Sequence, residues 1–370
     1  MKVLILSCKT GGGHDAAGQA VAEQLTAMGE EAYFFDYLTL AGQKVSDTVG
    51  GSYVGLVKKV PIVFGLLYKI GAVVSRIVRK SPVYYMNGLM APYLDRYLQE
   101  NTFDAIVMPH LFPAETITYM KRKGMQVPLT VAVATDYTCI PFWGETECDY
   151  YVIPSEENKS EFTTGKIYSE QLLAYGIPVS AKFIENISKM EARKKLGITH
   201  GERIYLVAGG SMGAGQIKTL VGVLAKMKKK KERIIVICGS NQKMKKKLSK
   251  RFRRDCTVTV IGRTDQMALY MKACDIIYTK PGGLTSTEAA VAEIPIVHTS
   301  PIPGCESVNR RYFRKHGMSV SSKETIGQAA AGVRLLENPE KCQKMKENQR
   351  KYISKDAAYQ IYTFMKKHIG

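Results

Sequence analysis

The sequence lacks several patterns that would assign a function at once. Its eight cysteines are scattered without a C-x-x-C pair, which leaves no zinc-binding pattern and favours reduced thiols in a cytosolic protein. Neither common phosphate fingerprint is present, since there is no G-x-x-x-x-G-K-[ST] and no G-x-G-x-x-G in register. A kinase or a dehydrogenase is therefore disfavoured.

Long apolar runs are also absent. The one membrane candidate is residues 53–80, whose longest uncharged run has nine residues, far below the ~20 that span a bilayer. Residues 44–80 carry seven basic side chains and one acidic one, which suits a helix lying in the interface of an anionic membrane. The predicted membrane contacts are Lys58, Lys59, Phe64, Lys69 and Arg76. The alternative is a buried helical hairpin with exposed lysines.

The formal net charge of +20 is unevenly distributed, because the first half of the chain is slightly acidic and the second half is strongly basic. Lysine and arginine concentrate in residues 226–233 and 243–254. A solvated surface explains such runs, and attraction to anionic lipid or nucleic acid is the alternative. Nucleic-acid binding predicts aromatic residues interleaved with the basic ones. These runs contain almost none, so no nucleic-acid partner is expected.

Short apolar segments alternate with helix-length amphipathic segments along the whole chain. Strands are predicted at 2–7, 31–36, 103–109, 128–136 and 149–154, and again at 203–209, 233–239, 256–262, 274–280 and 294–300. Strands that are apolar on both faces and separated by helices are typical of parallel sheets in doubly wound α/β domains. We expect an N-terminal domain at 1–178, a C-terminal domain at 179–352 and a closing helix within 353–370, with the linker inside 175–186.

Ligands of such domains bind beyond the carboxyl ends of the strands. In the second half, glycine-containing turns follow four successive strands, at 207–215, 238–242, 261–266 and 279–290. Glycines let backbone N–H groups approach an anion, and a helix N-terminus adds a favourable dipole. Packing alone explains one such turn, whereas four at equivalent positions indicate a nucleotide diphosphate site.

Acidic and amide side chains accompany these turns. Glu288 lies one turn into the helix predicted after Gly282 and Gly283, so it can reach a ribose whose diphosphate lies at the helix start. The alternative for Glu288 is an exposed acidic residue favoured by the helix dipole. The loop and helix after the next strand provide Glu306 and Asn309, where the variable part of a donor would lie.

These segments resemble those of the family 28 glycosyltransferases, and most of all their lipid branch. That branch includes the monogalactosyldiacylglycerol synthases of plastids and the processive diacylglycerol glucosyltransferases of bacteria. The matching segments are TGGGHDAA near the N-terminus, TDY…W at 135–143, GGSMG, KPGGLTSTEA and PIPGCESVN. The resemblance covers nearly the whole chain, and the pair TGGGH and PGG-x-T-x-x-E-A is specific.

The resemblance implies the two-domain GT-B fold, in which two Rossmann-like domains face a cleft and a C-terminal helix crosses back to the first domain. The C-terminal domain would bind a UDP-sugar, and the N-terminal domain would meet a lipid acceptor. The protein would be cytoplasmic and peripherally associated with the cytosolic face of the cell membrane. The family inverts the anomeric carbon and uses no cofactor and no metal as a chemical participant. The sequence agrees, because it contains no D-x-D pair to hold a metal on a diphosphate.

The resemblance also assigns roles to individual positions. Residues expected around the UDP-sugar are Gly210, Ser211, Gly213, Ser240, Arg263, Gly282, Gly283, Thr285, Glu288, Glu306 and Asn309. Among them, the glycines and Ser211 would face the diphosphate, Arg263 would lie where the backbone meets the uracil, and Glu288 would hold the ribose hydroxyls. Two positions depart from the family pattern. Cys305 is in place of a glutamine near the sugar, and Ile140 is in place of a histidine in residues 135–143, the segment that the resemblance assigns to the acceptor (the acceptor segment). A thiol replaces poorly an amide that both donates and accepts hydrogen bonds, so the donor sugar is left open.

An inverting transfer needs a base for the acceptor hydroxyl and a stabiliser for the departing diphosphate. His14 and Asp136 are the candidate bases, and His110 is a third candidate with a structural role as its alternative. His14 could instead bind phosphate or a lipid headgroup, or fix the turn, and Asp136 could cap the following segment. The backbone of the first domain would approach the donor phosphates or the lipid head at Gly11, Gly12 and Gly13.

The leading function is transfer of a hexose from a UDP-sugar to diacylglycerol or a similar membrane lipid. A polyprenyl-linked saccharide is the alternative acceptor within the same fold. A basic peripheral membrane or nucleic-acid-binding protein without catalysis is the alternative from a different class. The sequence leaves open which hexose is used, how many are added and the oligomeric state.

Overall fold

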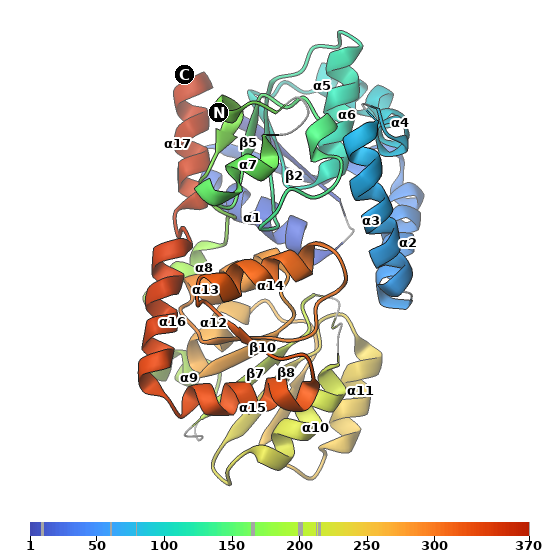
Figure 1. The fold of residues 1–370 in the computed structure, drawn as a ribbon. Helices are drawn as coiled ribbons and strands as arrows, with labels where there is room; N and C mark the ends of the chain where they lie inside the picture. Colours follow the sequence, from blue (N-terminus) through green and yellow to red (C-terminus); the bar gives the residue numbers. More distant parts are fainter. Residues whose placement is uncertain are drawn as a thin grey trace. The chain divides into compact units, whose positions relative to one another are not determined.

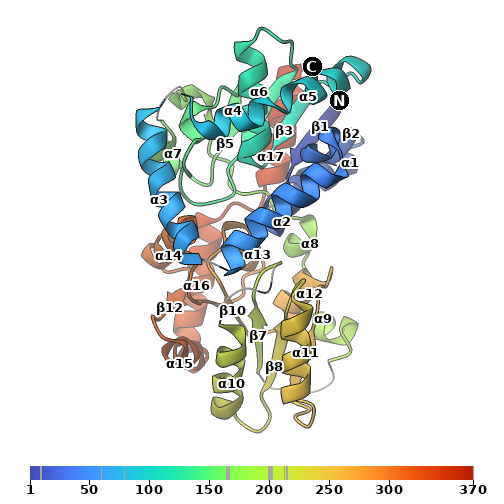
Figure 2. The same ribbon diagram turned by 90° about the vertical axis from the view of Figure 1, so that its right-hand side faces the viewer.

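The chain divides into two compact units in the computed structural model (Figure 1, Figure 2). The structure describes residues 1–370 except 9–10, 60, 79, 164–166, 199–202, 212, 214–215 and 370, and it describes no side chains at 52–54, 56–59, 61–64 and 76. Unit 1 comprises Met1–Ala181, Pro303–Cys305 and Ser354–Gly370, and unit 2 comprises Lys182–Ile302 and Glu306–Ile353. The chain thus leaves unit 1 shortly after the predicted boundary at 178. Apart from Pro303–Cys305, it returns to unit 1 at Ser354, within the predicted closing segment 353–370.

Unit 1 is built on a six-stranded parallel sheet in the order β2-β1-β3-β4-β5-β6. Its strands are β1 (Lys2–Ser7), β2 (Glu31–Asp36), β3 (Ala105–Met108), β4 (Leu129–Val133), β5 (Tyr150–Val152) and β6 (Leu172–Leu173). Alternate residues of β1 enter two separate cores, with Leu4 and Leu6 in one and Val3 and Ile5 in the other. This two-sided burial is the reason that the strands read as continuous apolar runs.

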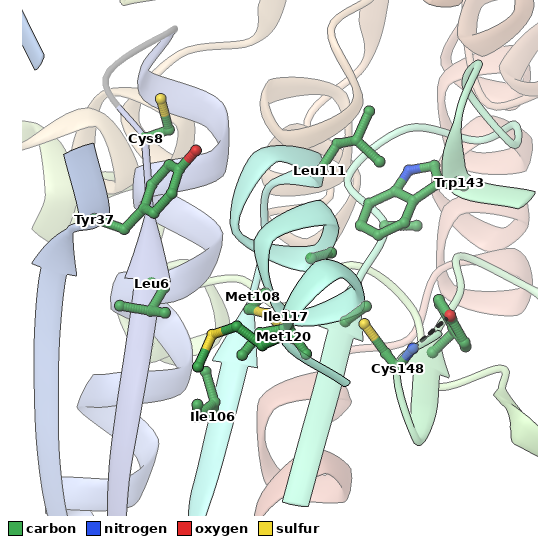
Figure 3. Packing of buried hydrophobic residues seen from close by; sticks show 14 of the residues in the cluster. Leu6, Cys8, Tyr37, Ile106, Met108, Leu111, Ile117, Met120, Trp143 and Cys148 are labelled. Atoms are coloured by element: carbon green, nitrogen blue, oxygen red, sulfur yellow. Dashed lines mark hydrogen bonds between the residues drawn. The ribbon is translucent and has the colours of Figure 1, made fainter. Parts of the chain in front are cut away.

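Helices cover both faces of the unit 1 sheet. The helices are α1 (Gly12–Ala27), α2 (Gln43–Lys59), α3 (Pro61–Ile77), α4 (Pro82–Gly88), α5 (Ala91–Glu100), α6 (Leu111–Arg122), α7 (Lys159–Phe162), α8 (Ala181–Ile184) at the boundary with unit 2, and α17 (Ala357–Ile369). Helix α17 buries Ile361 and Met365 against the core that contains Val3 and Ile5. The predicted crossing of the C-terminal helix back to the first domain is therefore confirmed. Helices α5 and α6 pack on the opposite face, in the core shown in Figure 3.

Unit 2 is built on a second parallel sheet, in the order β12-β11-β10-β7-β8-β9. Its strands are β7 (Ile204–Ala208), β8 (Arg233–Ile237), β9 (Val258–Ile261), β10 (Ile276–Thr279), β11 (Ile296–His298) and β12 (Val320–Ser321). Its helices are α9 (Lys189–Lys195), α10 (Ile217–Met227), α11 (Gln242–Arg251), α12 (Met267–Ala273), α13 (Gly283–Val291), α14 (Cys305–Lys315), α15 (Thr325–Leu336) and α16 (Pro339–Tyr352). Side-chain caps start several of them, because Ser188, Asn241 and Asn338 each accept a hydrogen bond from the backbone N–H three residues later.

The strand order places ligand-binding positions in each sheet. In unit 1 the strands β2 and β3 flank β1, and in unit 2 the strands β8 and β10 flank β7. The loops after β1 and β3 therefore run to opposite sides of their sheet, as do the loops after β7 and β10. Such a topological switch point is where open α/β sheets bind their ligands. Each sheet thus has one expected ligand position, beside β1 in unit 1 and beside β7 in unit 2.

No helix among the described residues has both the length and the apolar character needed to cross a membrane.

Candidate functional site

His14 lies in the first turn of α1, beside the switch point of the unit 1 sheet. Its Nδ1 atom is 2.8 Å from the carbonyl oxygen of Pro109 and 2.9 Å from Oγ1 of Thr135. Because a carbonyl oxygen only accepts hydrogen bonds, Nδ1 is a protonated donor, and in the neutral ring the lone pair is then on Nε2. The loops after β3 and β4 therefore hold His14 in the tautomer whose Nε2 can take up a proton.

His110 follows β3 and packs against His14, with 4.5 Å between the ring centroids. It is buried, and its Nδ1 accepts a hydrogen bond from the backbone N–H of Phe112 at 3.1 Å, which caps α6. Burial in the first place, and the neighbouring His14 in the second, lower the pKa of His110 well below its usual value. His110 is therefore a neutral capping residue, which agrees with the structural alternative for it.

Asp136 follows Thr135 in the loop after β4 and is partly buried. Since Thr135 contacts His14 directly, the structure brings one candidate base to the segment that contains the other. The same segment continues to Phe142, against which α3 packs. A Cβ atom on Gly71 of α3 would lie 3.2 Å from the ring of Phe142. The predicted acceptor segment thus connects His14 to the helix predicted to meet the membrane.

The glycine loop ahead of α1 leaves space for a ligand. Gly11 is the residue before the helix, and its φ of 165° is open to any residue. Apart from Gly11 and its chain neighbours, no described residue has an atom within 4 Å of the position where a Cβ would stand. Neither backbone strain nor packing within the described residues therefore explains the glycine at this position. An approaching anion would meet the N-terminus of α1 there. The roles of Gly11, Gly12 and Gly13 toward a substrate stay predictions.

In unit 2, the turns after β7 and β8 pack backbone against backbone. Gly213 has a φ of +56°, and a Cβ on it would lie 2.1 Å from the carbonyl oxygen of Cys238. Gly239 has a φ of +55°, and a Cβ on it would lie 2.4 Å from the carbonyl oxygen of Ser211. Ser240 N–H also donates to that same Ser211 oxygen at 2.8 Å. Packing therefore requires glycine at 213 and 239 whether or not a ligand binds.

The remaining donor-site candidates lie at or near the same edge of the sheet. Gly282 precedes α13 and Gly283 begins it. Ser240 and Arg263 are exposed in the turns after β8 and β9, while Thr285 is partly buried in α13. Together with Gly210, Ser211 and Gly213 after β7, the predicted residues thus lie after the carboxyl ends of four strands. Their contacts with a nucleotide stay predictions.

Glu288 is partly buried in the second turn of α13. It is therefore not the exposed acidic residue of the alternative explanation. Burial raises the pKa of Glu288 to about 8. A carboxyl group with a pKa of about 8 changes its ionisation state between neutral and mildly alkaline pH. The affinity of a ligand that it binds should therefore depend on pH.

Glu306 and Asn309 make contacts that the sequence did not suggest. Glu306 is buried, pairs with Lys280 and accepts a hydrogen bond from the Ile302 N–H at 2.7 Å. Asn309 is fully buried and donates to the carbonyl oxygen of Pro281 at 3.1 Å. Both side chains therefore support the turn after β10 in this structure, and their predicted proximity to the donor sugar stays a prediction.

Lys280 is the residue of this region that the sequence analysis did not assign. It directly follows β10, and its side chain is only 15% exposed. A lysine at a strand end, two residues before a glycine pair, was a usable signal. Lys280 does not stand out in the sequence, because lysine is abundant throughout the second half of the chain.

The membrane candidates are only partly described. Lys69 is exposed on α3, while the side chains of Lys58, Lys59, Phe64 and Arg76 lie outside the described residues. Leu66, Ile70, Val73 and Ile77 of α3 are 50–75% exposed. Their spacing of four, three and four residues places them in one stripe along the helix. The stripe is exposed, so this described part of α3 does not belong to a buried helical hairpin, which was the alternative explanation.

The described part of the chain contains no group of three or more histidine, cysteine, aspartate or glutamate side chains placed to hold a metal ion.

Two family models match the chain, one over most of each of its two units. Residues 14–179 match a family model described as monogalactosyldiacylglycerol (MGDG) synthase, and residues 188–352 match one described as glycosyl transferases group 1. A processive diacylglycerol beta-glucosyltransferase of Bacillus pumilus is 24% identical over 364 residues, which are 97% of this chain and 93% of that protein. The chloroplastic monogalactosyldiacylglycerol synthase 1 of Arabidopsis thaliana is 29% identical over 337 residues, which are 87% of this chain and 62% of that protein.

Solved structures share the fold over the whole chain. MurG of Acinetobacter baumannii superimposes with a TM-score of 0.64 at 15% identity, covering 99% of each chain. HepE of Anabaena in complex with UDP-glucose superimposes with a TM-score of 0.57 at 13% identity, covering 99% of this chain and 100% of that one. These similarities and the two parallel sheets confirm the expected GT-B fold with two Rossmann-like domains.

Proposed function

We infer the activity of this chain from the family to which it belongs, the lipid-glycosylating branch of the family 28 glycosyltransferases. It is a UDP-sugar-dependent hexosyltransferase of glycolipid synthesis. We propose diacylglycerol or a closely related membrane lipid as its acceptor. The observation that carries this proposal is the pairing of an MGDG synthase half with a glycosyl transferase half in one chain. The named relatives with that activity align with most of its length.

His14 is the proposed general base. The Nδ1–H group of His14 donates a hydrogen bond to the carbonyl oxygen of Pro109. The Nε2 atom then takes the proton of the acceptor hydroxyl as the hydroxyl oxygen attacks the anomeric carbon. The bond from that carbon to the diphosphate breaks, UDP leaves with the electron pair, and the configuration inverts. Asp136 is the alternative base, since it neighbours Thr135 in the same region.

Unit 2 is the proposed donor-binding unit. The turns after β7 and β10 and the start of α13 would face the diphosphate, and Glu288 would accept hydrogen bonds from the ribose. We propose that the transfer needs neither a cofactor nor a metal ion, as the resemblance to the family implies. Activity that survives saturating chelator would support this, and activity restored only by a divalent cation would contradict it.

The test of the function is a product analysis. The purified protein is incubated with UDP-glucose, UDP-galactose and UDP-N-acetylglucosamine, each with diacylglycerol vesicles or with a polyprenyl-linked saccharide. We expect a mass increase of one or more hexoses on the diacylglycerol. Transfer to the polyprenyl-linked acceptor alone would establish the alternative acceptor. Salt-dependent binding to DNA without affinity for UDP would overturn the enzyme assignment.

The pKa of Glu288 predicts a pH-dependent affinity for UDP. With a pKa of about 8, this carboxyl is mostly protonated at pH 7 and mostly ionised at pH 9. Only the carboxylate accepts from both ribose hydroxyls, so the dissociation constant should fall about tenfold between pH 7 and pH 9. Titration calorimetry over this range measures it. The Glu288→Gln variant should bind UDP with one affinity at every pH, and a wild-type affinity that does not vary would contradict the ribose assignment.

We also propose that α3 lies in the membrane interface through its apolar stripe. The stripe (Leu66, Ile70, Val73 and Ile77) is exposed, Lys69 is exposed on the same helix, and the helix packs through Gly71 on the acceptor segment. Apolar side chains inserted among headgroups, with basic residues beside them, suit an anionic surface. This arrangement would bring a lipid acceptor to the segment that reaches His14.

A vesicle-binding experiment tests the stripe. The double variant Ile70→Ser/Val73→Ser should bind anionic vesicles about tenfold more weakly, because two partly buried apolar contacts are lost. Ile326→Ser is the matched control, since Ile326 is an equally exposed apolar residue on α15 of unit 2. Lys69→Glu should weaken binding to anionic vesicles more than to neutral ones. Sedimentation showing equal binding by all these variants would contradict the proposal.

A further inference from the structure

Lys280 occupies the switch point of the unit 2 sheet. It directly follows β10, and β10 lies beside β7 at the place where the strand order reverses. A ligand of this sheet is expected between the loops after these two strands. Lys280, within the sequence TKPGG, thus places a cationic side chain at the expected ligand position.

The surroundings of Lys280 are the glycine turns already described. A Cβ on Gly210 in the turn after β7 would lie 3.1 Å from Cε of Lys280, and one on Gly282 would lie 3.9 Å from its Nζ. Gly210 has a φ of +67°, so both its backbone conformation and its closeness to the lysine stem favour glycine. The ammonium group therefore lies between the two turns whose backbone is expected to face the diphosphate.

Glu306 fixes the ammonium group from the other side. Its carboxylate is buried, pairs with Lys280 through Oε1 and accepts the Ile302 N–H through Oε2 at 2.7 Å. The hydrogen bond from the Ile302 N–H restricts the position of the Glu306 carboxylate, so the carboxylate in turn restricts the position of the Lys280 ammonium group. An ammonium has three N–H donors, and the pair with Glu306 uses one of them.

We propose that Lys280 binds the diphosphate of the UDP-sugar and neutralises the charge that develops on it as the sugar leaves. The inference rests on the proposed function and adds a residue to it. A fixed cation at the leaving group stabilises the transition state more than the ground state, because the negative charge on the diphosphate grows during bond cleavage. Glu306 is a positioning residue, which acts through Lys280 rather than on the sugar.

Binding of uridine and UDP by variants at Lys280 tests this assignment. Lys280→Met should weaken UDP binding by about 10- to 100-fold, because a charge-assisted hydrogen bond to the phosphates is lost. Uridine, which has no phosphate, should bind the variant as it binds the wild type. The turnover number should fall by at least the same factor. Lys246→Met is the matched control, since Lys246 is an exposed lysine on α11, and it should change none of these quantities.

A second variant separates ligand binding from support of the fold. Lys280→Met leaves the buried Glu306 without its partner, which destabilises a protein by itself. The double variant Lys280→Met/Glu306→Gln removes the whole ion pair, so it should bind uridine normally and UDP as weakly as the single variant. Glu306→Gln alone retains the ammonium and should lower the turnover number less than Lys280→Met. Lys280→Arg retains a cation and should recover part of the UDP affinity.

The outcomes separate the inference from the proposed function. Unchanged UDP affinity in both Lys280 variants would overturn the inference while leaving the enzyme assignment intact. Equal loss of uridine and UDP binding in the double variant would also overturn it, because the pair would then be structural. A wild-type protein that transfers no sugar and binds neither uridine nor UDP would overturn the proposed function itself.

Discussion

Replacing His14 with glutamine should lower the turnover number by about 10²- to 10⁴-fold, the range expected when a general base is removed. Glutamine keeps an amide N–H that can still donate to Pro109 and Thr135, so the local fold is preserved while the proton acceptor is lost. The affinity for UDP should not change, because His14 belongs to unit 1 and the donor candidates belong to unit 2. Initial rates with saturating donor and acceptor measure the effect.

Two neighbouring substitutions serve as controls for His14. Asp136→Asn tests the rival base, and a loss of about 10²- to 10⁴-fold in this variant, with His14→Gln still active, would assign the proton to Asp136. His110→Gln should cost stability more than activity, because the side chain caps α6 and is buried as a neutral ring. Wild-type turnover in His14→Gln would contradict the assignment of His14 as the base.

Replacing Trp143 with alanine should lower the free energy of unfolding by about 3–5 kcal/mol, the cost of removing a large buried aromatic side chain. Trp143 is 3% exposed in the core drawn in Figure 3, and its ring packs edge-on against Tyr151 with 6.3 Å between centroids. It belongs to the acceptor segment by sequence, yet the structure places it among core residues. Urea unfolding followed by circular dichroism should therefore show an earlier transition for unit 1.

A matched variant distinguishes packing from substrate contact at Trp143. Trp143→Phe keeps most of the apolar volume and should lose much less stability than Trp143→Ala. Both variants should retain transferase activity at low temperature in the fraction that remains folded. Normal stability combined with lost activity in either variant would show instead that Trp143 contacts the acceptor. Because Trp143 is the sole tryptophan, its fluorescence in the wild type reports unfolding of this core directly.

The part of the fold that the sequence predicts is the part with a strong local pattern of apolar and polar residues. All ten predicted strands are present, because a buried parallel strand is apolar on both faces and stands out between amphipathic helices. The two strands that were missed, β6 and β12, have only two residues each at the edges of their sheets. Such short segments contain too few residues to show a period, and only pairing with a neighbouring strand defines them.

The glycines show where local pattern stops being informative. Gly11 and Gly213 both lie in glycine-rich turns ahead of helices, so the sequence treats them alike. In the structure, Gly213 is required by the Cys238 carbonyl that lies against it, while no such atom of the described residues lies opposite Gly11. The difference depends on which atoms lie opposite the absent Cβ, and those atoms come from another loop.

The sequence by itself determined the doubly wound sheets and the edge of unit 2 at which the predicted donor residues gather. These features follow from periodicity, turn chemistry and motif spacing, which neighbouring residues encode. Only the tertiary structure decided that Nδ1 of His14 meets Pro109 across 95 positions of the chain, and that Lys280 pairs with Glu306 across 26. Only it decided that Trp143 is buried and that the apolar stripe of α3 is exposed. Hydrogen-bond partners and burial depend on which distant segments pack together, and long-range packing leaves no periodic trace in the sequence.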